Sequence, residues 1–413
     1  MQPERRRVLA WAFYDWANSA YATVVLAGFF PLFFKQYWAS DLATTESTFW
    51  LGAANSSSSL LIVLLAPLLG AAADRADARK RYLFRFALLG IVATATLWFV
   101  GAGAWGAAAA LFALATVGFM GANVFYDALL MQVAAPDERD RVSALGFALG
   151  YLGGGILFAG CVALVLMPQS FGLPDAGMAV RLSFLLTAVW WAAFSIPLLR
   201  SLHETPARLP LLPAVRAGAR ELVQTVRHLR QHRNAGLFLL AYWLYIDGVD
   251  TVVRMAVDYG MSIGFDSNDL IVALLIVQFV GFPATLVFGR LAAPLGARGG
   301  IFIALAVYAG TTVWASMMSA EWEFYGLAVI IGLVQGGVQA LSRSFFSRLV
   351  PADRAGEFFG FYNMMGKFAA IIGPLLIGAV GWLSGSPRVG ILSLLLLFGS
   401  GALLLARVRV PRS

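Results

Sequence analysis

Polar and charged side chains recur inside stretches of this chain that are otherwise apolar. The first such stretch opens with the segment YDWANSAY, in which Asp15, Asn18 and Tyr21 follow one another at intervals of three residues. Residues three or four apart lie on the same face of a helix, so these groups would line one surface. A carboxylate there can bind a cation or exchange a proton, and an amide or a phenol can hydrogen-bond a polar ligand.

Later stretches repeat the helical spacing. Asn123 precedes Asp127 by four residues, and the same interval separates Asp250 from Arg254. An ionised group at the centre of a bilayer costs about 2.5–3.5 kcal/mol on insertion scales, so it usually faces a cavity or a partner and indicates a functional site. We therefore predict a cavity for substrate binding and coupling, with these candidates: Asp15, Asn18, Tyr21, Asn123, Tyr126, Asp127, Tyr245, Asp247, Asp250, Arg254, Gln335, Gln339, Asn363 and Lys367.

Several of these residues allow a second interpretation. Asp250 and Arg254 can neutralise each other within one helix, which would make them structural, whereas Asp247 has no obvious local partner. Asp15 and Asp127 lie near the inner headgroup region, where a gate or a pairing with a loop arginine is as reasonable as contact with a substrate. Burial and nearby charge both shift a carboxyl pKa, so we hypothesise that one of these four carboxylates titrates during function.

The composition is that of a membrane protein. The chain has 413 residues, of which 60% are hydrophobic and 13% charged, and its mean hydropathy is +0.77. Soluble domains carry about 25% charged residues, and a membrane helix needs about 20 mostly apolar ones. The sequence predicts twelve such helices, near 9–36, 49–72, 83–104, 106–132, 143–167, 181–199, 235–259, 269–292, 300–319, 323–346, 358–383 and 389–406.

Basic residues predict the orientation and explain the net charge of +8. With both termini in the cytoplasm, most Lys and Arg fall on the inner side and only Lys35, Arg181 and Arg388 fall outside. The charge therefore needs no nucleic-acid partner. The first apolar run is too long for a signal-peptide core and is expected to remain as a helix.

A membrane-embedded enzyme would need clustered His, Cys or paired acids for metal or acid–base chemistry, and the predicted spans contain no histidine. Cys161 is the only cysteine and the three histidines fall in one central loop, so we expect no metal, no cofactor and no enzymatic activity. The sequence holds no phosphate-binding loop of the Gly-x4-Gly-Lys-Ser/Thr type, so transport energy would come from a gradient. Gly146, Gly150 and Gly154 are spaced by four and predict a close-packing seam.

Two halves flank a central interruption. We predict a six-helix bundle over residues 1–199, a cytoplasmic linker with a basic amphipathic helix over 200–234, and a second six-helix bundle over 235–413. The halves resemble diverged copies, because Asp15 can be aligned with Asp247 and Arg79 with Arg298. Two such bundles related by an axis along the membrane normal are typical of secondary transporters.

The inner loops carry a second group of candidates. The segment GAAADRADARKR after the second helix has a partial copy after the eighth, in which Ala293 stands in place of Asp74. Carboxylates and arginines there can form a network that holds the inner face closed, although plain positive-inside charge also explains them. The gating-loop candidates are Gly70, Asp74, Arg75, Arg79, Arg139, Gly289, Arg298, Arg343 and Arg354.

These motifs carry a family resemblance. GAAADRADARKR resembles the loop signature of the major facilitator superfamily, and YDWANSAY together with SRSFFSRLVPADRAGEFFGFYNMMGKFAAIIGP (342–374) resembles its vacuolar-effluxer-like branch. The resemblance implies an all-α membrane fold of twelve helices in two pseudo-symmetric bundles, with helices one, four, seven and ten lining a central cavity. The yeast prototype of the branch returns amino acids from the vacuole after autophagy.

The expected function is secondary active transport of a small solute by alternating access, with amino-acid efflux implied by the resemblance and proton coupling as a hypothesis. Export of amphipathic or drug-like compounds or lipids is the alternative, and a channel or a membrane-embedded enzyme is less favoured. The basic loops and compact size are typical of a bacterial protein, so we expect a monomer in the plasma membrane of a bacterium, with the lipid bilayer and a small molecule as its partners.

Overall fold

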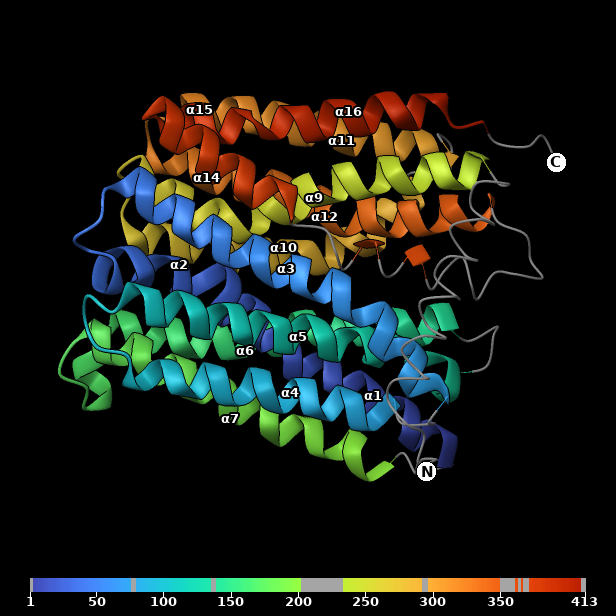
Figure 1. Ribbon diagram of the computed structural model, residues 1–413, viewed down its shortest axis with the longest axis horizontal. Helices are drawn as coiled ribbons and strands as arrows, with labels where there is room; N and C mark the ends of the chain where they lie inside the picture. Colours follow the sequence, from blue (N-terminus) through green and yellow to red (C-terminus); the bar gives the residue numbers. More distant parts are fainter. Residues whose placement is uncertain are drawn as a thin grey trace. The chain divides into compact units, whose positions relative to one another are not determined.

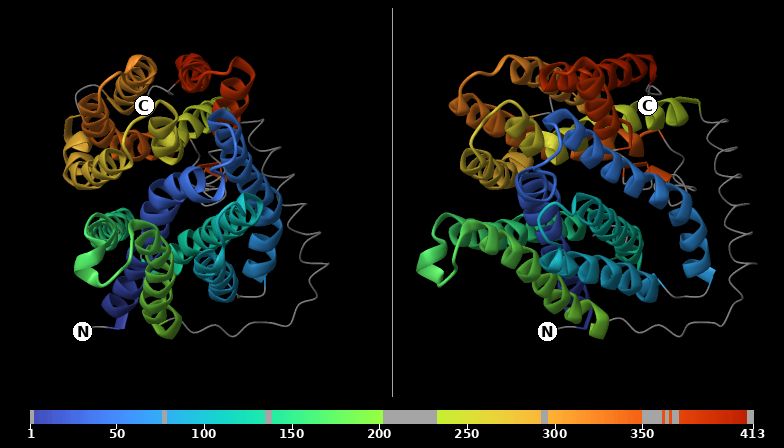
Figure 2. Two further views of the ribbon diagram at one scale, coloured as in Figure 1. Left: turned by 90° about the vertical axis from the view of Figure 1, so that its left-hand side faces the viewer. Right: turned by 60° about the vertical axis from the view of Figure 1, so that its left-hand side comes forward.

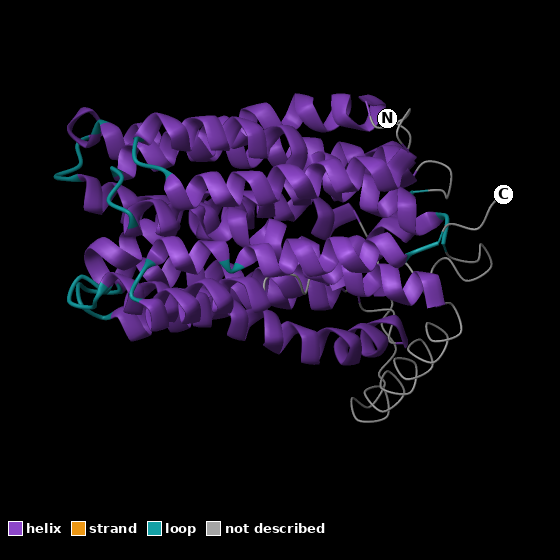
Figure 3. Cartoon of the chain, turned by 90° about the horizontal axis from the view of Figure 1, so that it is seen from above, coloured by secondary structure: helices purple, strands orange, loops and turns teal. Residues whose placement is uncertain are grey.

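The computed structural model describes residues 3–75, 79–134, 139–201, 233–291, 296–349, 361–362, 365–366 and 371–409. These residues contain helices and loops but no strand, so the all-α prediction is confirmed (Figure 3). The linker helix, Arg354, Asn363 and Lys367 lie outside the described residues. Seven further candidates lie in described helices, but their side chains are outside the description: Gly70, Asp74, Arg75, Asp127, Arg139, Gly289 and Arg343.

The first half of the chain forms long helices joined by short loops (Figure 1). They are α1 (Pro3–Ala20), α2 (Phe30–Phe33), α3 (Thr44–Arg75), α4 (Arg79–Thr96), α5 (Trp105–Val133), α6 (Arg139–Leu166) and α7 (Ala176–Ser201). Two π-helical segments, Tyr21–Phe29 and Phe34–Trp38, flank α2 and join it to α1 in one long apolar span. π-helical turns are rare and often occur at functional sites, and the sequence gives no signal for them.

The second half continues the pattern from α9 to α16. Its helices are α9 (Arg233–Ser262), α10 (Ser267–Leu291), α11 (Gly296–Met317), α12 (Glu321–Ser347), α14 (Ile372–Ser384), α15 (Pro387–Leu392) and α16 (Leu394–Arg407). In this half α9 packs against α16, and α12 packs against both α10 and α11 (Figure 2).

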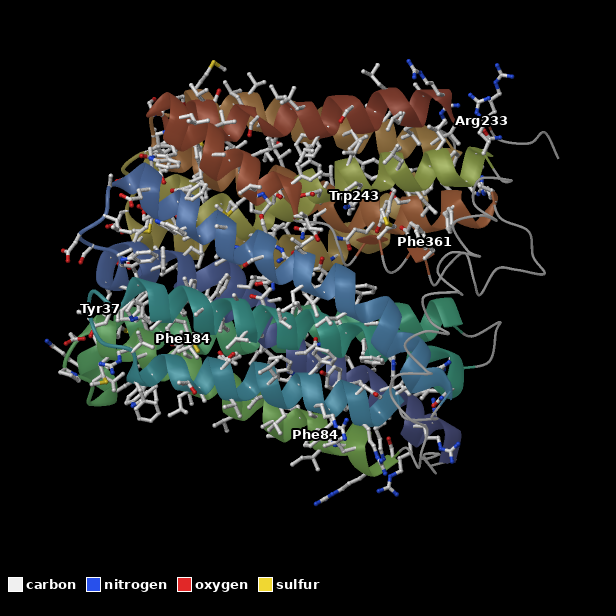
Figure 4. The ribbon with its side chains drawn as sticks, viewed as in Figure 1. Tyr37, Phe84, Phe184, Arg233, Trp243 and Phe361 are labelled. Atoms are coloured by element: carbon white, nitrogen blue, oxygen red, sulfur yellow. The ribbon has the colours of Figure 1, made fainter. Side chains whose placement is uncertain are left out.

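Nine helices in the described part are long and apolar enough to cross a membrane, and Ile372–Ser384 is a shorter apolar helix. Each of the twelve predicted stretches overlaps a described helix, so the predicted count is consistent with the structure. Large apolar side chains on the outer faces are exposed, as expected for helices in contact with lipid. Phe84, for example, is 39% exposed and points away from α4 (Figure 4).

Contacts along the chain group the described residues into two units. One comprises those of Met1–Asp41 and Ser57–Arg220, and the other those of Leu42–Ser56 and Glu221–Ser413. Residues 42–56, the first part of α3, therefore pack with the second unit, although they belong to the first half of the sequence. Here Ser56 donates a hydrogen bond to the Ile371 carbonyl oxygen over 2.7 Å. The predicted bundle boundaries at 199 and 235 remain predictions.

In each unit, two basic side chains donate hydrogen bonds to carbonyl groups at helix C-termini, and the two contacts of one unit match those of the other. In the first unit, Lys80 donates to the Leu199 carbonyl (3.3 Å) and Arg181 to the Trp98 carbonyl (Nε to O, 2.9 Å). In the second, Arg298 donates to the Ala406 carbonyl (2.6 Å). Arg388 donates to the Ser316 and Met318 carbonyls. Cations stabilise the negative end of a helix dipole, so these contacts close the helix ends.

The positions of these contacts support the internal repeat. Lys80 and Arg298 are 218 residues apart, as are Trp98 and Ser316. Likewise Arg181 and Arg388 are 207 residues apart, as are Leu199 and Ala406. The same donor–acceptor pairs therefore occur at matching places in both halves. These contacts make Lys80 the counterpart of Arg298, in place of Arg79, which the sequence patterns had aligned with it.

Candidate functional site

The first unit brings the polar residues of α1 and α5 together. The Asn18 side-chain amide donates to the Asn123 amide oxygen over 2.5 Å, and both residues are buried. One turn further along the chain, the Tyr21 and Thr116 hydroxyls lie 2.9 Å apart. The structure therefore brings Asn18 and Asn123 into direct contact, and whether they line a substrate cavity remains a prediction. A buried amide pair with remaining donors and acceptors can hydrogen-bond a neutral or zwitterionic solute.

Aromatic side chains pack beside this amide pair. Trp11 stacks on Tyr126 with ring centroids 4.3 Å apart, and its indole N–H donates to the Tyr126 carbonyl over 2.9 Å. Tyr14 contacts the same tyrosine ring from one turn further along α1. Gly146 of α6 lies against Trp11, because a Cβ at that position would be 2.9 Å from the indole ring. The aromatic group thus fixes α1 against α5 and α6.

Asp15 lies where α1 meets α6. It is half-buried, and its Oδ1 accepts a hydrogen bond from the Ser19 hydroxyl over 3.2 Å. A Cβ on Gly150 would lie 2.6 Å from that hydroxyl and 3.2 Å from the Asp15 carboxyl carbon. The predicted glycine seam of α6 is confirmed, since Gly154 meets Thr23 in the same way.

The second unit holds Asp247 in a more complete version of this arrangement. Its Oδ1 accepts from the Thr251 hydroxyl (3.2 Å) and from the Gly373 backbone N–H (2.9 Å). Its Oδ2 accepts from the Ile372 N–H over 2.8 Å. Ile372 and Gly373 are the first residues of α14, whose N–H groups have no partner within the helix. Asp247 is fully buried and caps this helix inside the membrane.

The two carboxylates are counterparts in the repeat and differ in their surroundings. Asp15 with Ser19, and Asp247 with Thr251, share the same four-residue spacing and the same 3.2 Å hydrogen bond to Oδ1. Asp247, however, faces the start of a helix, whereas α6 runs without a break past Asp15. Asp247 therefore caps α14, and the expectation that it has no obvious local partner is wrong, because Thr251 lies one turn away on α9.

Asp250 and Arg254 lie one turn apart on α9 and influence each other electrostatically. Asp250 is half-buried and Arg254 is 8% exposed. The buried Nη1 of Arg254 makes no hydrogen bond within the part of the chain that the structure describes. Buried polar groups are usually hydrogen-bonded, so this N–H is a position where a ligand can supply the acceptor. A guanidinium is the side chain that matches a carboxylate most closely.

Three further candidates lie on the helices around Arg254. The Tyr245 hydroxyl lies 2.6 Å from the Ser342 hydroxyl of α12, and both residues are buried. Gln335 and Gln339 are half-buried on the same face of α12. The structure therefore places polar groups on α9 and α12 of the second unit, as it places them on α1 and α5 of the first.

Two gating candidates, Arg79 and Arg298, have described side chains. Arg298 caps α16 through the Ala406 carbonyl and lies over the Phe302 ring at 5.7 Å. Arg79 lies at the start of α4, next to Lys80, which caps α7. Arg298 is thus fully explained by a structural role, and the predicted latch between loops remains untested.

Sequence reasoning missed one buried carboxylate. Asp258 is fully buried in the last turns of α9, and its Oδ2 accepts from the Thr48 hydroxyl over 2.8 Å. Thr48 belongs to the segment of α3 that packs with the second unit. The i, i+4 spacing of Arg254 and Asp258 was available in the sequence, and following it one turn further would have identified this residue.

The arrangement suits binding and conformational change. Among the described residues, no group of three His, Cys, Asp or Glu side chains is placed to hold a metal ion. In the first unit, half-buried Asp15 and the Asn18–Asn123 amide pair offer a carboxylate and hydrogen-bonding groups. In the second unit, Asp250 and Arg254 offer charges of both signs. Groups of these kinds recognise small polar solutes.

Comparison with known proteins agrees with this reading. A family model described as vacuole effluxer Atg22 like matches residues 41–413. The uncharacterized MFS-type transporter YxiO of Bacillus subtilis (strain 168) is 39% identical over 401 residues, which cover 97% of this chain and 94% of that protein. Autophagy-related protein 22 of Yarrowia lipolytica (strain CLIB 122 / E 150) is 28% identical over 276 residues, covering 58% of this chain. The matched region spans 45% of the fungal protein.

Solved structures of transporters share the fold. A D-xylose-proton symporter superposes with a TM-score of 0.73 at 14% identity, and the nucleoside transporter NupG with 0.67 at 12% identity. In both cases the match covers 98% of each chain. At such low identity the likeness concerns the fold alone.

Proposed function

Because the chain belongs to the Atg22-like vacuole effluxer family and is an integral membrane transporter of the major facilitator type, we propose that it exports an amino acid or a similar zwitterionic solute by alternating access. Effluxer relatives support the direction of transport, and the charge pattern of α9 supports the substrate class. Transporters of this architecture bind their substrates near the middle of the membrane.

The observation that carries this proposal is the pair Asp250 and Arg254. Arg254 offers a buried N–H without a hydrogen bond in the described structure, and Asp250 lies one turn away and is half-buried. The carboxylate of an amino acid would bind the guanidinium, and its ammonium group would bind the Asp250 carboxylate. Charge-assisted hydrogen bonds of this kind are about twice as strong as neutral ones.

In this proposal, the half-buried carboxylates bind and release the coupled proton. Asp247 accepts hydrogen bonds from two backbone N–H groups, which cannot accept a proton in return. Asp15 and Asp250 are the half-buried members of this group, and Asp127 remains a candidate from the sequence. A carboxylate next to the bound ammonium group can release a proton when the solute arrives.

Solute counterflow in proteoliposomes tests the proposal. Arg254→Gln should lower amino-acid exchange at least 100-fold, and Arg254→Lys, which keeps the charge but not the planar fork, should lower it less. Arg85→Gln is the matched control, because Arg85 is exposed on α4. Full exchange by Arg254→Gln would refute the assignment, and exchange of amphipathic dyes in place of amino acids would favour the alternative substrate class.

The coupling part has a separate test. Asp250→Asn should lower counterflow through the lost contact with the ammonium group, and it should abolish transport driven by a pH gradient. Asp269→Asn is the control, since Asp269 lies in the first turn of α10. Gradient-driven transport that survives in both variants would exclude Asp250 as the coupling group.

A further inference from the structure

One indole N–H group on α9 has no role in the function proposed above. Trp243 is half-buried and lies on α9 (Figure 4). Its Nε1 atom is buried and makes no hydrogen bond to any residue that the structure describes. An indole N–H can only donate, and buried polar groups are usually hydrogen-bonded. This N–H is therefore a second position, besides Arg254, where a ligand can supply an acceptor.

Trp243 lies on the same face of α9 as the two residues proposed to bind the solute. It precedes Asp250 by seven residues and Arg254 by eleven, and all three belong to one unbroken helix, Arg233–Ser262. With 3.6 residues per turn, these intervals are close to two and three full turns. At a rise of 1.5 Å per residue, Trp243 lies about 10 Å from Asp250 along the helix axis, on the side away from Arg254.

This separation matches the length of one amino acid. In the proposed site the ammonium group binds Asp250 and the carboxylate binds Arg254, so the side chain of the solute is the part that can extend along α9 toward Trp243. Hydrogen bonds of about 3 Å at Asp250 and at the indole N–H leave about 4 Å between the ammonium nitrogen and the acceptor. A side chain as long as that of asparagine or glutamine spans this distance with bonds of about 1.5 Å.

We propose that Trp243 determines specificity, by favouring amino acids whose side chain ends in a hydrogen-bond acceptor such as an amide oxygen. This inference rests on the proposed amino-acid site and names the substrate class that the site takes. An apolar side chain of the same length would displace water from the indole N–H without replacing its hydrogen bond. A buried donor left unpaired in this way weakens binding about 5- to 150-fold.

Counterflow in proteoliposomes tests the inference with glutamine and norleucine as the two probes. Their side chains have similar lengths, but only that of glutamine ends in an amide. We expect the half-saturation concentration of glutamine to be at least tenfold lower than that of norleucine. In Trp243→Phe the ratio should fall to about one, while norleucine exchange stays the same. Trp322→Phe is the matched control, because Trp322 is 66% exposed on α12.

A second form of the protein separates the N–H group from the shape of the ring. It carries, at position 243, a tryptophan analogue in which sulfur replaces the ring N–H, and it should also lose the preference for glutamine. If Trp243→Phe does not fold, this form decides the test. Equal half-saturation concentrations in the unaltered protein, or a preference for glutamine that survives in the analogue, would overturn the inference.

The inference and the proposed function fail in different ways. An equal loss of exchange for both probes in the analogue-bearing protein would assign Trp243 to packing, and it would overturn the inference alone. The proposed function fails if Arg254→Gln keeps full exchange of both probes, because no amino-acid carboxylate would then depend on the guanidinium.

Discussion

Asp247→Asn should selectively weaken the start of α14. The carboxylate accepts three hydrogen bonds in a fully buried position, two of them from the first backbone N–H groups of the helix. An asparagine has one acceptor oxygen and an NH2 group that only donates. In its best orientation the oxygen keeps the bonds from Thr251 and Gly373, and the NH2 group then faces the Ile372 N–H.

The magnitude follows from the bond that is lost. A hydrogen bond to a charged group contributes about 1.5–3 kcal/mol, and a buried donor left without a partner costs a similar amount. We therefore expect the free energy of unfolding to fall by about 2–3 kcal/mol. Since 1.4 kcal/mol is a factor of ten, exchange of the Ile372 and Gly373 amides through local opening should accelerate by about 30- to 150-fold.

Unfolding in mixed detergent–SDS micelles measures the first quantity, and hydrogen exchange with mass spectrometry measures the second. Asp15→Asn is the matched control. Asp15 occupies the same place in the repeat but is half-buried and faces a continuous helix. Its substitution should change stability by about 1 kcal/mol or less. Equal effects of the two substitutions, or unchanged exchange at α14 in Asp247→Asn, would refute the capping role.

Three other predictions concern packing and side-chain contacts, each measured as the thermal midpoint and the free energy of unfolding in detergent. Gly373→Ala should destabilise by more than about 2 kcal/mol, because its Cβ would lie 2.0 Å from the Thr251 hydroxyl, whereas Gly155→Ala, with open space around it, should be nearly neutral. Thr48→Val removes the donor to buried Asp258 and should cost about 1–3 kcal/mol, against almost no change for exposed Thr96→Val. Arg298→Met should cost about 0.5–1.5 kcal/mol through the lost contact with α16; a neutral result would assign that helix end to water.

The membrane fold was predictable because the signals that determine it depend only on the order of residues along the chain. A bilayer requires about 20 apolar residues for each helix and favours basic residues inside, and both signals can be counted along a sequence. The close packing of α6 was also predictable from its glycines at every fourth position, but the partner helix was not. Gly146, Gly150 and Gly154 meet residues of the first span.

The roles of individual charges were harder to predict because each depends on backbone that is distant in sequence. Asp247 looked unpaired, yet its partners are N–H groups at residues 372 and 373, and they are available only because α14 begins there. The contact of Arg298 was hidden for the same reason. Its acceptor is the backbone carbonyl of Ala406, and a backbone carbonyl cannot be identified from residue types in a sequence.

The repeat resolves part of this difficulty. Two copies that diverge from one arrangement keep the contacts needed for folding in both, as the matched helix caps of Lys80 and Arg298 show. A position where the copies differ is a better candidate for function. Asn18 follows Asp15 by three residues, as Asp250 follows Asp247, so these two positions are counterparts. Asn18 pairs with Asn123 in the first unit, whereas Asp250 lies beside Arg254 in the second. That difference in charge, rather than the presence of charge in the membrane, is what singles out Asp250 and Arg254 as the pair to test first.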